Sequence, residues 1–147
     1  MVHIRPYKDN DQEQVIKLWR LVFPNAPAHN DPMQDIQSKT AIQPELFFVR
    51  ILDDKVVGTA MSGFDGHRGW VYYVAVHPEY RRNGIGTKLM QRIESSLHDL
   101  DCSKINLQIR SDNAEVRSFY ESIGYALEER ISMGKRLGLS SKTRSAD

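Results

Sequence analysis

The chain has 147 residues, of which 40% are hydrophobic and 27% charged, and its formal net charge is +1. This is the length of one ordinary domain and the composition of a globular protein, and the small charge excludes bulk electrostatic attraction to nucleic acid or to an anionic membrane. One cysteine allows no intrachain disulfide, the first residues carry no signal-peptide pattern, and no apolar run is long enough to span a membrane, so we expect a cytoplasmic protein.

The first third of the chain predicts one strand and two helices. Residues 2–5 alternate in character like a short strand, and Asp9 or Asn10 is a suitable cap for the helix that follows. Proline-rich residues 24–32 end that helix as a loop, and a shorter helix is predicted over residues 33–40. The first helix carries one apolar face at the spacing i, i+3, i+4, i+7, formed by Val15, Leu18, Trp19 and Val22.

Three strands separated by two turns are predicted next. Residues 46–52 are apolar, and residues 56–62 return as the hairpin partner after a tight turn. After a second turn, at residues 65–69, residues 70–76 are almost continuously apolar and strongly β-forming, which is typical of a strand covered on both faces.

The second half predicts a helix, a fifth strand, another helix and closing strands. The fifth strand alternates over residues 105–109, Asp112 with Glu115 is typical of a helix start, and Gly124 of a helix end. Residues 125–137 predict one or two closing strands, so the whole order is mixed α/β around one sheet. The helix that opens at the glycines after residue 83 has the core face Leu89, Met90, Ile93 and Leu97.

A glycine-containing loop joins the strand at 70–76 to the helix, which is a typical arrangement for binding phosphate. The free N–H groups of a first helical turn point at the ligand, and glycine lets the backbone approach closely. Arg81, Arg82 and Lys88 lie in this stretch, and no Asp or Glu occurs between Tyr80 and Arg92. Because a helix start ordinarily favours acids, their absence indicates that an external anion takes their place.

Two other phosphate motifs do not fit this loop. A P-loop needs Gly-Lys-Ser/Thr, whereas Thr87-Lys88 follows Gly86 in the wrong order. A dinucleotide fingerprint needs a third glycine, and Leu89 stands at that position. The alternative without a ligand is an ordinary strand-to-helix connection that contains glycine.

The run Val74-Ala75-Val76-His77-Pro78-Glu79-Tyr80-Arg81-Arg82-Asn83-Gly84-Ile85-Gly86 resembles the acyl-CoA motif of GNAT acetyltransferases. A second block of that family is matched by Asn113-Ala114, Phe119-Tyr120 and Ile123-Gly124-Tyr125, in the right order and spacing. The stretch 63–79 is similar to the signature of the YpeA-type bacterial subgroup. The resemblance implies a GNAT fold, a mixed sheet of about six to seven strands flanked by about four helices, over residues 1–137 with a polar, frayed tail at 138–147.

The resemblance also implies acetyl-CoA as acyl donor. The family's pyrophosphate cradle corresponds to Arg81, Arg82, Asn83, Gly84, Ile85, Gly86 and Thr87. In the family, the preceding strand splays from its neighbour at a bulge and pairs with the pantetheine arm, which corresponds to Val74, Ala75 and Val76. Asn113 matches an asparagine that contacts the same arm, while helix capping is its alternative role.

Catalysis needs a proton donor for the leaving thiolate and a base for the acceptor ammonium. Tyr120 matches the family's general acid and lies beside the cofactor; its alternative role is a core tyrosine. The fifth-strand glutamate of relatives that acetylate protein N-termini is replaced by Gln108, so we consider Asp65 and His67 as base or acceptor contacts, with a structural turn as the alternative.

The acceptor is expected to be a primary amine, on a small molecule rather than a protein, received by residues 24–32, the helix near Met33 and the turn 65–69. His29, Asp31 and Asp35 could attract a cationic amine. The alternatives are acetylation of a protein lysine or N-terminus, or a non-catalytic acyl-CoA-binding regulatory module. No metal site, no nucleic-acid partner and no membrane partner are expected, and a homodimer is compatible with a tyrosine-rich central strand.

Overall fold

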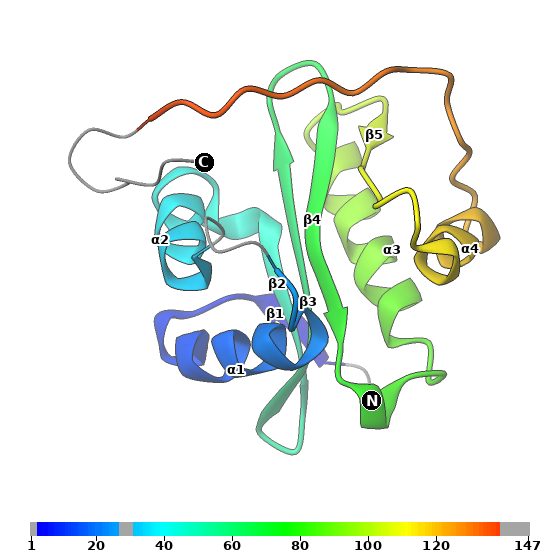
Figure 1. Ribbon diagram of the computed structural model, residues 1–147. Helices are drawn as coiled ribbons and strands as arrows, with labels where there is room; N and C mark the ends of the chain where they lie inside the picture. Colours follow the sequence, from blue (N-terminus) through cyan, green and yellow to red (C-terminus); the bar gives the residue numbers. More distant parts are fainter. Residues whose placement is uncertain (1–2, 27–30, 139–147) are drawn as a thin grey trace. The chain divides into compact units, whose positions relative to one another are not determined.

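The computed structural model describes residues 3–26 and 31–138 (Figure 1). The described residues up to 108 form one compact unit, and those from 109 to 138 form a second. The strands are β1 (His3–Pro6), β2 (Phe47–Leu52), β3 (Lys55–Phe64), β4 (Gly69–Val76) and β5 (Ile105–Asn106). The helices are α1 (Gln12–Val22), α2 (Pro32–Ile42), α3 (Ile85–His98) and α4 (Ala114–Ser122), with short 3₁₀ helices η1 (Asp9–Asp11), η2 (Pro44–Leu46) and η3 (Pro78–Tyr80).

The first unit is built on one five-stranded sheet in the order β1-β2-β3-β4-β5. The first four strands are antiparallel, and β5 pairs parallel with β4 through Gly69↔Ile105 and Trp70↔Asn106. An antiparallel meander with one parallel edge strand is a mixed sheet, and its connections through helices agree with the predicted α/β class.

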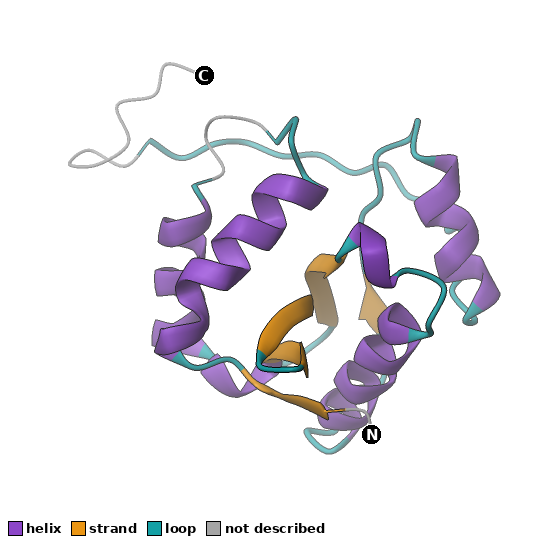
Figure 2. Cartoon of the chain, turned by 90° about the horizontal axis from the view of Figure 1, so that it is seen from below, coloured by secondary structure: helices purple, strands orange, loops and turns teal. Residues whose placement is uncertain are grey.

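Helices cover both faces of this sheet, with α1 and α2 on one side and α3 on the other (Figures 1 and 2). Successive residues of a strand point to opposite faces. The Thr59 hydroxyl accepts a hydrogen bond from the Trp19 indole of α1 at 2.9 Å, whereas a Cβ at Gly58 would meet Ile85 and Leu89 of α3 at 3.0 and 3.1 Å. Gly58 therefore lets α3 pack closely on the sheet.

The predicted apolar faces of the helices form the core. In α1, Val15, Leu18 and Trp19 are buried and Val22 packs against them, and all four predicted positions of α3 are buried. The Trp19 ring lies between two aromatic side chains, because it is stacked on Tyr73 with centroids 3.8 Å apart and tilted against Phe47 at 5.9 Å. These contacts confirm the helical periodicity.

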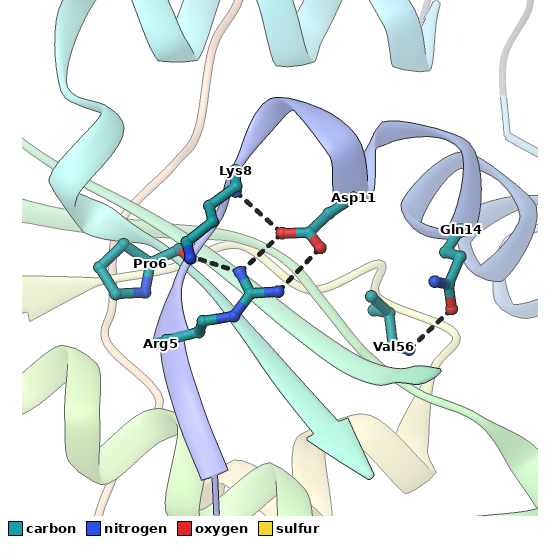
Figure 3. A network of polar contacts seen from close by, with 6 residues as sticks. All are labelled: Arg5, Pro6, Lys8, Asp11, Gln14 and Val56. Atoms are coloured by element: carbon teal, nitrogen blue, oxygen red, sulfur yellow. Dashed lines mark hydrogen bonds and ion pairs between the residues drawn. The ribbon is translucent and has the colours of Figure 1, made fainter. Parts of the chain in front are cut away.

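The start of α1 differs from the prediction, because Asp9 and Asn10 lie in η1 and do not cap the helix. Asp11 instead stands before Gln12, and its carboxylate accepts two hydrogen bonds from the Arg5 guanidinium, at 2.8 and 2.9 Å, and one from the Lys8 backbone at 2.8 Å (Figure 3). Burial opposes ionisation of this group, but these partners outweigh it and lower the pKa of Asp11. The first strand is thereby tied to the first helix.

The sheet has five strands and not the six or seven expected, because residues 125–138 form no strand in the described structure. A strand satisfies its N–H and C=O groups only beside another strand, and the described part of the second unit contains no other. β5 also ends at Asn106, which leaves Leu107 to Ile109 outside the strand that their alternation predicted. Four apolar side chains of the final segment are exposed: Leu127, Ile131, Met133 and Leu137.

The second unit is organised around α4. The Asn113 side chain accepts a hydrogen bond from the Val116 backbone at 3.1 Å, so Asn113 caps this helix and the predicted cap Asp112 does not. Gly124 adopts a φ of +104° just after the helix, in the left-handed region that glycine favours, as expected for a helix end. No helix of the described chain is long and apolar enough to cross a membrane.

Candidate functional site

The N-terminus of α3 has none of the internal partners that a helix start usually recruits. Its cap residue, Gly84, makes no side-chain hydrogen bond, and no acidic residue lies in the first turn. The first intrahelical bond is donated by Lys88 to the Gly84 carbonyl at 3.0 Å, so the N–H groups of Ile85, Gly86 and Thr87 precede the hydrogen-bonded ladder. Free N–H groups of this kind, together with the helix dipole, are what a helix start uses to bind an anion.

The loop before α3 presents this end with an unusual backbone. Arg82 and Gly84 both have a left-handed φ, +68° and +74°, and a Cβ at Gly84 would meet no atom within 4 Å. The Arg81 Nε donates to the Val76 carbonyl and the Asn83 amide to the Tyr80 carbonyl, each at 3.2 Å. The predicted cradle residues thus form the loop 81–84, anchored to the end of β4 and to η3, and the first residues of α3, Ile85 to Thr87.

β4 leads into this loop and carries a bulge. Thr59 pairs with Ala75 and Met61 with Tyr72, so one residue of β3, Ala60, stands opposite both Tyr73 and Val74. Beyond Trp70 no described strand pairs with the outer edge of β4, because β5 contributes only two residues. The predicted positions Val74, Ala75 and Val76 therefore lie on a strand edge that is open toward the loop.

Side chains from α1 and α2 hold the bulge in place. Tyr73 has a left-handed φ of +51°, rare for an aromatic residue. Its carbonyl accepts a hydrogen bond from the Thr59 hydroxyl at 2.9 Å, its ring stacks on Trp19, and its hydroxyl donates to Asp35 at 2.6 Å. Burial, together with the bond to Asp35 and the charges of Asp35 and Asp31, raises the pKa of Tyr73.

Sequence reasoning missed this role of Tyr73. Tyr73 lies within the stretch 63–79 that resembles the subgroup signature, but nothing in a strand pattern reveals a bulge. Asp35 and Asp31, predicted to receive a cationic amine, lie in and just before the first turn of α2, and Asp35 approaches the bulge through Tyr73. Residues 27–30, including His29, lie outside the described residues.

The turn residues Asp65 and His67 stand at the other end of β4. From Gly69 to Val76 the strand spans roughly 23 Å at about 3.3 Å per residue, so the structure does not bring them together with the cradle. The Asp65 carboxylate accepts hydrogen bonds from the backbone N–H groups of His67 and Arg68, both at 2.7 Å, and these bonds lower the pKa of Asp65. This geometry stabilises the hairpin turn.

The remaining predicted site residues belong to the second unit. Asn113 caps α4, as described above, and its side chain is exposed. Tyr120 is 7% exposed, its ring makes edge contacts with Phe119 and Tyr125, and burial raises the pKa of Tyr120 to about 12. Its phenol keeps its proton at neutral pH. Across residues 3–26 and 31–138, no group of three or more His, Cys, Asp or Glu side chains could hold a metal ion.

Sequence comparison identifies close relatives over nearly the whole chain. The model of the acetyltransferase (GNAT) family matches residues 13–125. An acetyltransferase of Yersinia pestis (strain Pestoides F) is 41% identical over 136 residues, which cover 92% of this chain and 96% of the relative.

Solved structures share the fold at lower identity. Ard1 from Thermoplasma volcanium superposes with a TM-score of 0.73 at 22% identity, covering 86% of this chain and 84% of that one. AAC(6')-Iy, solved in complex with the bisubstrate analogue CoA-S-monomethyl-acetylneamine, superposes with a TM-score of 0.77 at 14% identity, covering 93% and 99%. At these identities the likeness is one of fold alone.

Proposed function

Because this chain belongs to the GNAT acetyltransferase family and has the mixed α/β fold that its motifs predicted, we propose that it is an N-acetyltransferase that transfers an acetyl group from acetyl-CoA to a primary amine. The observation that carries the proposal is the start of α3, which has no side-chain cap and no acid in its first turn. It follows directly on an edge of β4 with which no strand of the described residues pairs beyond Trp70. An anionic ligand with an extended arm fits both features.

In this proposal the N–H groups of the turn Arg81 to Thr87 hold the pyrophosphate, and the guanidinium groups of Arg81 and Arg82 add positive charge. The backbone of Val74 to Val76 pairs with the pantetheine arm. For Asn113 and Tyr120, which belong to the second unit, a role as contacts of the same ligand stays a prediction. The CoA-containing analogue in AAC(6')-Iy, a protein of the same fold, supports coenzyme A as the ligand.

When bound, acetyl-CoA supplies a thioester whose carbonyl the neutral amine attacks. Tyr120 enters the reaction as a hydrogen-bond donor. The pKa of Tyr120, about 12, lies above the value of about 8.5 for a cysteine-like thiol, so complete proton transfer from the phenol to the thiolate is unfavourable. A hydrogen bond donated by the phenol still stabilises the developing thiolate. The ammonium form of the acceptor must lose a proton before the amine attacks. The assignment of Asp65 or His67 as the base that accepts this proton remains a prediction.

The acceptor side is proposed at α2 and the bulge. Asp35 binds Tyr73 through one carboxylate oxygen, Oδ2, at 2.6 Å, and Asp31 supplies a second negative charge at the helix start. A cationic primary amine is the complementary ligand, and we favour a small molecule over a protein substrate. Acetylation of a protein lysine or N-terminus is the alternative. The two are distinguished by whether free amines or peptides stimulate the release of CoA from acetyl-CoA.

Several further assignments stay predictions: the YpeA-type subgroup, the domain limits 1–137, a cytoplasmic location and a homodimer. The domain is proposed to include α4 and the following segment, because the family match extends to residue 125. Of the predicted tail at 138–147, residues 139–147 lie outside the described residues.

The first test is a thermal-shift titration with acetyl-CoA, beside ATP and NAD at equal concentrations. A ligand at about 100 times its Kd stabilises the fold by about 2.7 kcal/mol. We expect acetyl-CoA alone to raise the Tm, and an amine screen that follows free CoA then identifies the acceptor. Equal or absent shifts with all three ligands would contradict the proposed cradle.

A further inference from the structure

A cavity lies between the sheet and α3 and shares Asn83 and Ile85 with the predicted cradle. The cavity has a volume of about 230 Å³ and is lined by two residues of β2, one of η3, one of the loop and two of α3: Arg50, Leu52, Tyr80, Asn83, Ile85 and Lys88. Arg50 pairs with Gly58 across β2 and β3, and Gly58 faces Ile85 and Leu89, so the cavity belongs to the face of the sheet that α3 covers. All of these residues are in the first unit.

Arg50 is a buried charge without a counter-charge. Arg50 is only 7% exposed. Its Nε–H has no hydrogen-bond acceptor, and its NH1 group donates to the Ile51 carbonyl. No ion pair involves it among the residues that the structure describes. An arginine is almost never buried unless it is paired, so the position of Arg50 favours an anion beside its guanidinium.

The surroundings of the cavity favour that anion. The two ionisable side chains that line it besides Tyr80 are the cations Arg50 and Lys88, and no carboxylate lines it. The Arg92 guanidinium, one turn further along α3, lies over the Phe48 ring at 4.8 Å on the same face. Ile85 is the first residue of α3, so the positive end of the helix dipole also faces this region.

We propose that this cavity, the Arg50 pocket, binds a phosphate-type anion. A volume of about 230 Å³ accommodates a phosphate group with a few waters, since one water takes about 30 Å³. Two sources supply such a group, a free phosphate ion or the 3′-phosphate on the ribose of coenzyme A. The second source rests on the proposed function, and the first does not.

The pocket is tested by thermal melts of the full chain in inorganic phosphate, titrated at constant ionic strength against sodium chloride. Wild type gains Tm with phosphate, Arg50→Met loses that gain, and Lys88→Met reduces it. Arg50→Met removes a buried unpaired charge, so it is expected to fold at least as stably as wild type without phosphate. Lys17→Met, at an exposed lysine of α1 on the other face of the sheet, keeps the full gain.

Affinities for coenzyme A and its 3′-dephospho form identify the source. If the cofactor fills the pocket, wild type binds coenzyme A about tenfold more tightly, as expected for one charge-assisted contact, and Arg50→Met removes the difference. If a free ion fills it, the two forms bind alike and phosphate still raises the Tm at saturating coenzyme A.

Two results would contradict the proposed anion site. One is a phosphate-dependent gain in Tm that is unchanged in Arg50→Met. The other is a wild-type protein that shows neither a gain in Tm with phosphate nor a difference in affinity between the two coenzyme forms. Failure of the proposed function has a separate signature. Neither form of coenzyme A would then bind, while the phosphate-dependent gain of wild type and its loss in Arg50→Met would remain.

Discussion

Helices α2 and α3 begin in opposite ways, although both pack on the same sheet. At α2 the Asp31 side chain accepts from the Met33 backbone at 3.1 Å, Pro32 opens the helix, and Asp35 adds an acid to the first turn. At α3 the cap is Gly84, without a side-chain bond, and the first turn holds no acid. The chain satisfies the dipole of α2 with its own side chains, whereas the first turn of α3 has neither a side-chain cap nor an acid of its own.

The difference separates two kinds of site. The start of α2 is negatively charged and joined to the bulge of β4 through the hydrogen bond from Tyr73 to Asp35. The start of α3 is positively charged and joined to the end of the same strand through the bond from Arg81 to Val76. A cationic acceptor and an anionic donor would therefore meet along one strand, β4.

The largest effect is expected at Tyr120. Tyr120→Phe removes the proposed donor to the leaving thiolate, so kcat falls by about 10³-fold while acetyl-CoA affinity is unchanged. Steady-state kinetics and calorimetric titration measure the two quantities. Tyr7→Phe is the matched control, because Tyr7 is also 7% exposed and burial likewise raises the pKa of Tyr7 to about 12. Equal kcat values in the two variants would contradict the catalytic role of Tyr120. They would not contradict ligand binding at the start of α3.

Giving α3 an acid of its own tests the comparison directly. Gly84→Asp places a carboxylate where the anion is proposed to bind, so we expect about 100-fold weaker acetyl-CoA binding, or about 2.7 kcal/mol, by calorimetry. Gly66→Asp is the control, because Gly66 also has a left-handed φ, +92°, with no atom within 4 Å of a Cβ. The two variants carry similar backbone strain, so equal affinities would show that the cradle holds no anion.

Removing the charge at α2 tests the acceptor side. Asp35→Asn keeps a partner for the Tyr73 hydroxyl but loses the negative charge, so the KM for the acceptor amine rises by about tenfold while acetyl-CoA affinity is retained. Asp53→Asn, in the exposed turn between β2 and β3, should change neither quantity. An unchanged KM in Asp35→Asn would remove Asp35 from the acceptor site.

The smallest effect concerns a third helix start, that of α1, where Asp11 pairs with Arg5 (Figure 3). The fold lowers the pKa of Asp11 below its ordinary 3.8, so the unfolded chain binds the proton more readily. The stabilisation is therefore complete above that value and is lost as the pH falls through the lower folded pKa. Asp11→Asn should lose about 1 kcal/mol of unfolding free energy at pH 7 and converge on wild type in acid, measured by urea unfolding.

Much of this fold follows from local patterns. The stripes of α1 and α3, the hairpins and the helix-ending Gly124 were predictable, because side-chain periodicity reports which face of an element is buried. The absence of acids in the first turn of α3 was equally visible. Helix caps were predicted less well, since Asp9, Asn10, Asp112 and Asn113 are all good capping residues and backbone geometry selects among neighbours.

The family, the α/β class and the cation-rich, acid-free turn before α3 can all be predicted from the amino-acid sequence, because these depend on residue types at short spacings. Four other features appear only in the folded chain: the bulge at Tyr73, its bond to Asp35, the two-residue length of β5 and the unpaired charge of Arg50. Each of these depends on the register of strands or on contacts between residues distant in the chain, which no local pattern encodes.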